Sequence, residues 1–254
     1  MKIFRINFEG HPRFGILEGS FIRLLDGAPF RAIHTTEQTV PIKNAKLLAP
    51  SAPTKIIGLG LNYHDHAKEM GVAIPTSPLT FLKPSTSVTG PDTEIVYPSV
   101  SHRVDYEGEL AVVIKSHAWR VSKEDALNYV LGYSCFNDVT ARDLQNSDSQ
   151  WTRAKGFDTF AAVGPCIETE LNPTDVLVET YLNGHCKQSG STSNLIYSVV
   201  DVINFISHVM TLLPGDIIAM GTPSGIGPMY PGDTVEVRIK EIGVLRNKVV
   251  DNGR

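Results

Sequence analysis

Three acidic residues, Glu107, Glu109 and Asp138, have the types and spacing needed to hold a metal ion. The two glutamates precede the apolar run 110–114, which predicts a buried strand. Because side chains alternate between the faces of a strand, both glutamates point to one face and Gly108 to the other. Buried like charges are costly unless a cation compensates them, and three oxygen ligands suit a hard ion such as Mg²⁺ or Mn²⁺. An acidic strand end in solvent has the same pattern, so the other motifs must decide between the two interpretations.

His66 and Glu69 lie three residues apart in segment 63–70, which is predicted to be a short helix with Asn62 as its N-cap and Gly71 as its end. On a helix this spacing places both side chains on one face, within contact distance. A carboxylate that accepts a hydrogen bond from an imidazole fixes its tautomer and raises its basicity, as a water-activating base requires. Such pairs also occur on surfaces without a function, so the interpretation depends on the other motifs.

Arg142 and Gln145 follow Asp138 by four and seven residues, so one turn or helix could bring them into the same cleft. An arginine there suits a substrate carboxylate through a bidentate contact. Thr222 lies in the glycine- and proline-rich segment 221–225, where a hydroxyl and backbone N–H groups can bind a carboxylate. The alternatives are polar residues that serve solubility and a tight turn that needs glycine.

The elements that must position these residues are mostly strands. Segments 55–60, 216–220 and 234–239 are predicted strands, and two further helices are predicted at 122–130 and 198–213. The second of these helices has a continuous apolar stripe and is followed by a Pro-Gly pair. The pattern predicts a β-rich α+β fold.

Two regions differ in character along the chain. Residues 1–50 contain short strands and Gly turns and are predicted to form a small N-terminal β domain, with a catalytic domain over 51–254. A Pro-containing stretch at 48–53 is the predicted linker. The Gly-Leu-Gly at 58–60 resembles the start of a dinucleotide fingerprint, but the third glycine and a long helix do not follow, so that class of site is rejected.

Charge and cysteine content limit the class of partner. A net charge of −4 without basic runs predicts neither a nucleic-acid nor an anionic-membrane partner. No stretch of eighteen apolar residues suits a membrane span, and the N-terminus lacks a signal-peptide core. The three cysteines are widely spaced and form no CxxC, which suits a reducing compartment. We therefore expect a soluble cytoplasmic protein.

Together the motifs resemble the fumarylacetoacetate hydrolase family, in its short prokaryotic form with a small N-terminal domain. The matching blocks follow the family's order and approximate spacing, and any one of them alone would be a weak signal. They include 58–63, 66–70, 81–84, 105–110, 137–142, 155–160, 163–165 and 221–228.

This resemblance implies a mixed β-sandwich roll, a homodimer and one Mg²⁺ per active site. Glu107, Glu109 and Asp138 would be the ligands of the metal, with Mn²⁺ as the other candidate ion. It also makes Lys155 a catalytic-site cation that could stabilise an enolate or oxyanion beside the metal.

The resemblance further implies a 2-oxo acid substrate. The leading hypothesis is metal-dependent hydrolysis of a C–C bond in an acylpyruvate or related 1,3-diketo acid through a metal-stabilised enolate, with His66 and Glu69 activating water. The alternative is a decarboxylase, tautomerase or isomerase of a 2-oxo diacid of the oxaloacetate or 2-hydroxyhepta-2,4-diene-1,7-dioate type. A non-catalytic module that binds a metal and a carboxylate, and a purely structural role for the acidic residues, are the hypotheses from other classes.

Overall fold

In the computed structural model, which describes residues 1–251, the chain is built mainly from three β-sheets. The predicted β-rich α+β fold is confirmed, and two of the sheets mix parallel with antiparallel pairing. Ten of the twelve strands of the largest sheet follow the order β4 (Thr35–Pro41), β3 (Phe21–Leu25), β2 (His11–Glu18), β1 (Lys2–Phe8), β14 (Ala161–Glu168), β12 (Val130–Asp138), β11 (Gly108–Ile114), β17 (Ile217–Ala219), β6 (Ile56–Gly60) and β7 (Leu79–Lys83). The other two strands, β5 (Lys46–Leu47) and β8 (Val88–Thr89), pair with β1 and β14.

Two smaller sheets complete the β structure. The five-stranded sheet has the order β16 (His185–Ser191), β15 (Leu177–Leu182), β19 (Thr234–Ile239), β20 (Gly243–Asp251) and β9 (Thr93–Tyr97). The three-stranded sheet has the order β13 (Thr140–Ala141), β10 (Val104–Tyr106) and β18 (Gly227–Met229).

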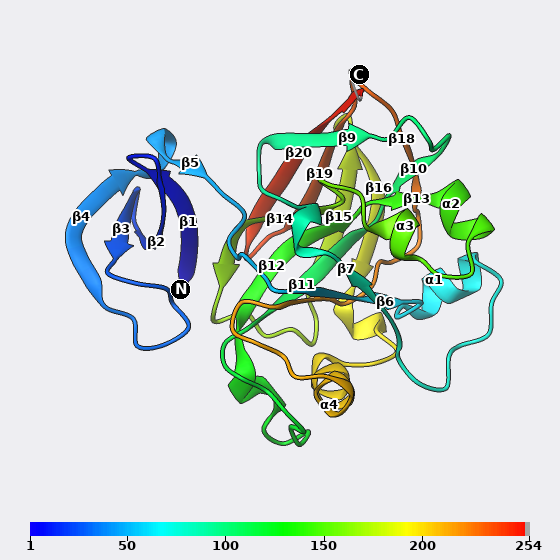
Figure 1. Ribbon diagram of the computed structural model, residues 1–254, viewed down its shortest axis with the longest axis horizontal. Helices are drawn as coiled ribbons and strands as arrows, with labels where there is room; N and C mark the ends of the chain where they lie inside the picture. Colours follow the sequence, from blue (N-terminus) through cyan, green and yellow to red (C-terminus); the bar gives the residue numbers. More distant parts are fainter. Residues whose placement is uncertain (252–254) are drawn as a thin grey trace.

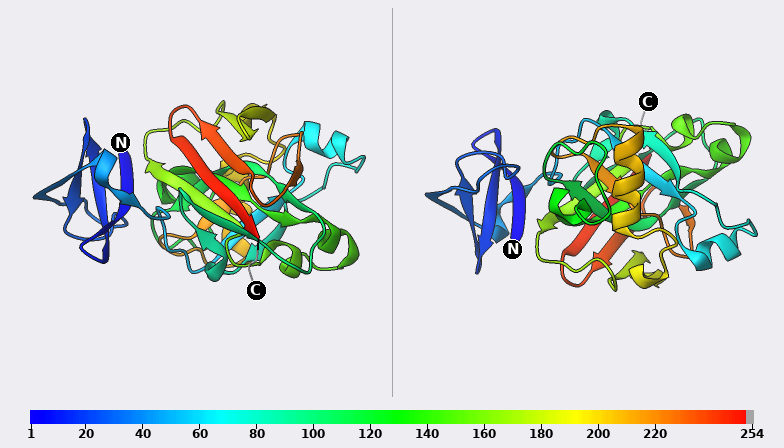
Figure 2. Two further views of the ribbon diagram at one scale, coloured as in Figure 1. Left: turned by 90° about the horizontal axis from the view of Figure 1, so that it is seen from above. Right: turned by 90° about the horizontal axis from the view of Figure 1, so that it is seen from below.

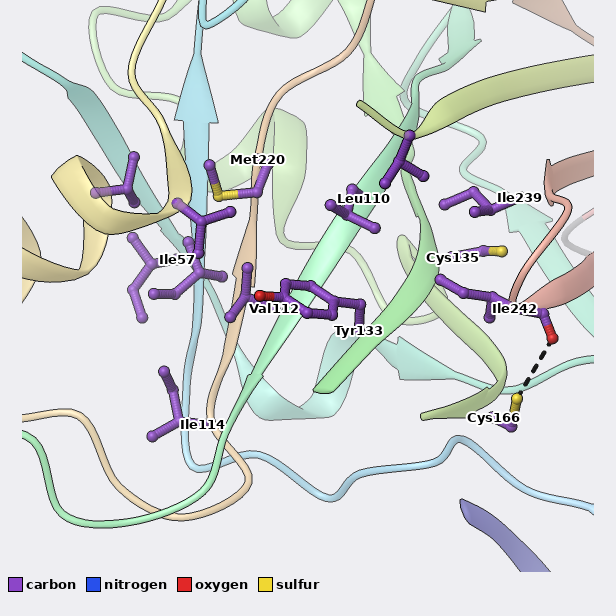
Figure 3. Close-up of a cluster of buried hydrophobic side chains, with 14 of the residues drawn as sticks. Ile57, Leu110, Val112, Ile114, Tyr133, Cys135, Cys166, Met220, Ile239 and Ile242 are labelled. Carbon is purple, nitrogen blue, oxygen red and sulfur yellow. Dashed lines mark hydrogen bonds between the residues drawn. The ribbon is translucent and has the colours of Figure 1, made fainter. Parts of the chain in front are cut away.

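The main core lies between the largest and the five-stranded sheet, where β11, β12 and β14 pack against β15, β19 and β20. Leu110 and Cys135 from the first sheet and Ile239 from the second belong to one buried cluster (Figure 3). Every residue of β11 is buried, which explains why its segment 110–114 is a continuous apolar run rather than an alternation.

The N-terminal strands continue the largest sheet. β1 pairs antiparallel with β14 through Lys2 opposite Glu168 and Ile3 opposite Ile167. The amino group of Met1 also lies 2.6 Å from Oε1 of Glu168. Figure 1 shows β1 to β4 on one side of the molecule and the helices α1 (His64–Glu69), α2 (Arg142–Ser147) and α3 (Thr152–Lys155) on the other side.

The longest helix of the described residues, α4 (Val199–Val209), packs beneath the sheets (Figure 2). Its first turn has a capping box, because Ser198 accepts from the Asp201 N–H and Asp201 accepts from the Ser198 N–H. The helix ends four residues before the predicted end, because Met210 is extended and Leu212 forms a bridge with Ala118.

Two local predictions are wrong. Segment 122–130 is not an α-helix: Ser122 and Asp125 form a turn, and only a single 3₁₀ turn follows before β12 begins. Asn62 does not cap α1, because its side chain bonds to backbone groups of Tyr197 and Met220 instead. The 3₁₀ turns are η1 (Ile42–Asn44), η2 (Ser85–Ser87), η3 (Ala126–Tyr129) and η4 (Thr192–Asn194). Within 1–251 the helices are all too short or too polar to cross a membrane.

Candidate active site

The three acidic residues predicted to bind a metal come together at one point. Glu107 lies between β10 and β11, Glu109 is in β11, and Asp138 ends β12, the strand paired with β11. One carboxylate oxygen of each lies within 4.8 Å of the others, and all three side chains are buried. A cluster of buried oxygen ligands is the donor set that Mg²⁺ or Mn²⁺ prefers. We call these residues the acidic trio.

The backbone between the two strands fixes this geometry. The Asp138 N–H donates to the Glu107 carbonyl at 2.9 Å, and the Glu107 N–H donates to the side-chain oxygen of Asn137 at 3.0 Å. Gly108 is the residue opposite Asn137 in the antiparallel register. The carboxylates of Glu107 and Asp138 are therefore held side by side by the ladder itself.

Two buried lysines surround the acidic trio. Nζ of Lys155 donates to Glu107 at 2.8 Å and to Asp138 at 2.6 Å, so it bridges two of the three carboxylates. Lys83, at the end of β7, donates to Asp138 and to the carbonyl of Val139. Lys155 is therefore a fully enclosed cation and not an exposed loop residue.

Arg142 supplies the third cation. Its guanidinium donates to Glu107, to the side-chain oxygen of Gln145 and, at 2.9 Å, to Asp105. Both Arg142 and Gln145 are in α2, so the predicted turn or helix after Asp138 does bring them to the same place. Three of the five N–H groups of the guanidinium are thus engaged, which leaves two for a ligand.

Charge is distributed unevenly over the trio. Burial alone would raise the pKa of Glu107, but the charges of Lys155 and Arg142 outweigh burial and lower its pKa. Burial together with the charges of Asp138 and Glu107 raises the pKa of Glu109 well above its ordinary value. The site without an ion therefore disfavours the charged form of Glu109, and a divalent cation would compensate that charge, so the acidic trio fits such an ion in its oxygen donors and in its charge.

The predicted contact between His66 and Glu69 is present. Oε2 of Glu69 lies 3.0 Å from Nδ1 of His66, and Oε1 of Glu69 accepts the Gly225 N–H at 2.9 Å. Asp65 accepts a hydrogen bond from the Ser224 hydroxyl at 3.1 Å, which also fastens α1 to the 221–225 turn. His66 is buried, whereas His64, two residues earlier in the same helix, is exposed.

A cavity of about 190 Å³ joins the predicted catalytic groups. It is lined by His66, Glu107, Arg142, Gln145, Lys155 and Thr222 on its polar side. The apolar residues that line it, which we call the apolar wall, include Leu59, Leu61, Met70, Val72, Phe81 and Trp151. The cavity thus brings an imidazole, two cations and a hydroxyl together in one small space.

Sequence reasoning missed several groups that hold the site. Lys83, 55 residues from Asp138, was given no catalytic role, and Asp105 and Gln188 were not singled out. No local sequence signal marks Gln188, because its buried position in the otherwise mostly exposed strand β16 is visible only in the structure. Thr222 is placed against the Gly108 carbonyl, to which its hydroxyl donates at 2.9 Å.

Comparisons with protein families match almost the whole chain. The profile described as fumarylacetoacetate (FAA) hydrolase C-terminal matches residues 55–250, and the profile described as Rv2993c-like, N-terminal, matches residues 1–50.

Solved structures and sequence relatives agree with these profiles. The 5-carboxymethyl-2-hydroxymuconate delta-isomerase of Mycobacterium smegmatis has a TM-score of 0.94 and 41% identity, over 99% of this chain and 100% of its own. The 2-hydroxyhepta-2,4-diene-1,7-dioate isomerase of Mycobacterium marinum has a TM-score of 0.93 and 41% identity, over 100% of both chains. The mitochondrial oxaloacetate tautomerase Fahd2a of Rattus norvegicus is 38% identical over 232 residues, 87% of this chain and 74% of its own.

Proposed function

Because the chain belongs to the fumarylacetoacetate hydrolase family, we propose that it is an enzyme that moves a proton within a 2-oxo acid. The reaction interconverts keto and enol forms, or shifts a double bond along a conjugated acid. The observation that carries the proposal is that His66, which contacts Glu69, and Glu107 of the acidic trio line the same small cavity. The names of the similar isomerases and of the tautomerase support this chemistry over hydrolysis as the first candidate.

The acidic trio would hold a divalent cation, Mg²⁺ or Mn²⁺. When bound, that ion supplies Lewis-acid stabilisation of the negative charge that develops on the 2-oxo oxygen.

His66 performs the proton transfer. Because Glu69 accepts the proton of Nδ1, the Nε2 atom carries a lone pair and is the basic nitrogen. Nε2 removes the proton from the carbon next to the 2-oxo group, and the electron pair of that C–H bond forms the C=C bond of the enolate. The same nitrogen then returns the proton, to the oxygen in tautomerisation or to a distant carbon in isomerisation.

Arg142, Gln145 and Lys155 position the acid, and Thr222 lines the same cavity. The two remaining N–H groups of Arg142 suit the substrate carboxylate, and Gln145 orients the guanidinium that presents them. Lys155 adds a positive charge beside the atoms where charge develops. The apolar wall limits access of water to the enolate.

Hydrolysis of a C–C bond in an acylpyruvate is the second candidate. It is favoured by the apolar wall around Leu61 and Val72, which suits an uncharged acyl chain better than a second carboxylate. In that reaction Nε2 of His66 would take a proton from water rather than from carbon.

One NMR experiment separates these reactions. Acetylpyruvate and oxaloacetate are each incubated in D₂O with the protein and Mg²⁺, or with the protein and a chelator. Metal-dependent deuterium incorporation next to the 2-oxo group, without cleavage and above the rate with Mg²⁺ alone, supports the proposal. Acetate and pyruvate from acetylpyruvate would favour hydrolysis, pyruvate and CO₂ from oxaloacetate would favour decarboxylation, and no reaction of either acid contradicts the proposal.

A further inference from the structure

We infer that Gln188 is a positioning residue that fixes the spacing of Glu107 and Glu109 and joins this pair to the 221–225 turn. Gln188 lies in β16, far from the acidic trio in sequence, and its side chain is 1% exposed. The inference about metal binding concerns the acidic trio alone. The part of the inference that concerns Glu69 and His66 rests on the proposed function.

Both polar backbone groups of Gly108, the residue between the two glutamates, are bound by side chains. The Gly108 N–H donates to Oε1 of Gln188 at 3.0 Å, and the Gly108 carbonyl accepts from the Thr222 hydroxyl at 2.9 Å. Further along the strand, residues 111–113 of β11 pair with β17, which ends at Ala219. At Gly108 these two side chains therefore take the place of a partner strand.

The same amide of Gln188 also holds the turn. Its Nε2 donates to the Thr222 hydroxyl at 2.7 Å and to the Pro223 carbonyl at 2.8 Å, so both of its protons are used. A Cβ at Gly190, two residues further along β16, would lie 2.4 Å from Cβ of Pro223. The turn is thus packed directly on the strand that carries Gln188.

The two ends of the turn bind one carboxylate of the acidic trio and the carboxylate that contacts His66. The Gly221 N–H donates to Glu109 at 2.8 Å, and the Gly225 N–H donates to Glu69 at 2.9 Å. A Cβ at Gly221 would lie 2.8 Å from Cβ of Asn62, and its φ of +90° also favours glycine, so the close approach of this residue to Asn62 requires glycine. A displacement of the turn would change the positions of both carboxylates together.

Loss of the Gln188 amide is therefore expected to weaken metal binding. Partners that orient metal ligands typically change affinity about 10–100-fold when they are removed. Gln188→Met keeps a similar length and volume but none of the three hydrogen bonds, and we expect its Kd for Mn²⁺ to rise about tenfold.

The test is a Mn²⁺ titration followed by electron paramagnetic resonance, together with amide hydrogen exchange at Gly108 and residues 221–225. The matched control is Thr180→Val, because the Thr180 hydroxyl is buried against Gly108 and has no hydrogen-bond partner among residues 1–251. This control should bind Mn²⁺ as the wild type does. Gln188→Met should show weaker binding and faster amide exchange in the turn.

Unchanged Mn²⁺ affinity and amide exchange in Gln188→Met would overturn the inference. If that variant does not fold, Thr222→Val removes the hydroxyl that links the amide to the Gly108 carbonyl and must raise the Kd, whereas Thr222→Ser must retain affinity. A wild-type protein that binds Mn²⁺ but exchanges no substrate proton would contradict the proposed function and leave this inference standing. A wild-type protein that binds no Mn²⁺ would overturn the inference.

Discussion

Glu69 fixes the orientation of His66, with Oε2 of the carboxylate 3.0 Å from Nδ1 of the imidazole. The second oxygen of this carboxylate accepts the Gly225 N–H, so the base is tied to the same turn that contacts Glu109. The orientation of the imidazole therefore depends on the structure that also supports the acidic trio.

Replacement of His66 tests its role as the base. We expect His66→Ala to lower the rate of substrate deuterium exchange by about 10²–10⁴-fold, the usual contribution of general-base catalysis. Glu69→Gln should lower the rate less, because the glutamine oxygen can still accept the Nδ1 proton but carries no charge. His64→Ala is the matched control, since His64 is exposed on the same helix. Full exchange activity in His66→Ala would exclude this mechanism.

Removal of the bridging lysine should destabilise the metal-free protein and increase its response to metal. Lys155→Met leaves Glu107 and Asp138 without the cation between them, and breaking a buried ion pair costs about 3–5 kcal/mol. Burial lowers the pKa of Lys155, but the charges of Asp138 and Glu107 outweigh it and raise the pKa, so the group is a cation at neutral pH. Lys123→Met, at an exposed pair, is the control. A Tm equal to that of the wild type without Mg²⁺ would contradict the expectation.

Addition of metal should stabilise the wild-type protein. An ion that binds only the folded state at a concentration of 100 times its Kd adds about 2.7 kcal/mol to the free energy of unfolding. We expect a Mg²⁺-dependent rise in Tm that a chelator reverses and that Glu109→Gln reduces, because this change removes one ligand charge of the acidic trio. The purely structural interpretation of the trio predicts no rise in the wild type.

Local pattern predicted that Glu107 lies beside Glu109 and His66 beside Glu69, whereas their assignment to a metal site and a catalytic base depended on the other motifs and the family resemblance. The apolar run of β11 fixes the alternation that places Glu107 and Glu109 together, and a helical spacing of three brings His66 to Glu69. Asp138 joins them because β12 pairs with β11 along nearly its whole length. Each of these contacts lies within one strand pair or one helical turn.

Contacts between distant elements could not be predicted in the same way. Gln188 reaches Gly108 across 80 residues, and Lys83 reaches Asp138 across 55. Local composition and periodicity do not indicate which sheets pack together, and it is this packing that creates these contacts. The pairing of β1 with β14 is of the same kind, since the short strands of 1–50 were predicted but not their partner in the main sheet.

Protonation of Glu236 should contribute to the loss of stability at low pH. Burial alone would raise its pKa, but hydrogen bonds from Arg238 and Arg246 outweigh burial and lower the pKa below its ordinary value. A carboxylate with a lowered pKa in the folded state adds stability above its unfolded pKa of about 4.3, and this stability is lost as pH falls through the folded pKa. Glu236→Gln should therefore be less stable than the wild type at pH 7, and the difference should shrink below pH 4.3. Urea unfolding at several pH values measures it, and a constant difference would contradict the assignment.

Because Gly108 lies close to the Thr180 hydroxyl, replacement of this glycine should change both the stability of the protein and its metal affinity. A Cβ at this position would lie 1.9 Å from the Thr180 hydroxyl oxygen, so Gly108→Ala must displace the Thr180 side chain or one of the strands β11 and β15. Overpacking of this kind typically costs about 1–3 kcal/mol. Here it should also weaken Mn²⁺ binding, since the displaced residue separates two ligands of the acidic trio.

Thr180→Ala in the same chain should restore part of both losses, because it removes the hydroxyl that the new methyl group meets. Gly27→Ala is the matched control, since nothing lies within 4 Å of a Cβ built there and its backbone needs no glycine. Urea unfolding and Mn²⁺ titration measure the two effects. Loss of metal affinity in Gly108→Ala that Thr180→Ala does not reduce would mean that the clash with the Thr180 hydroxyl is not what displaces the two glutamates in this variant.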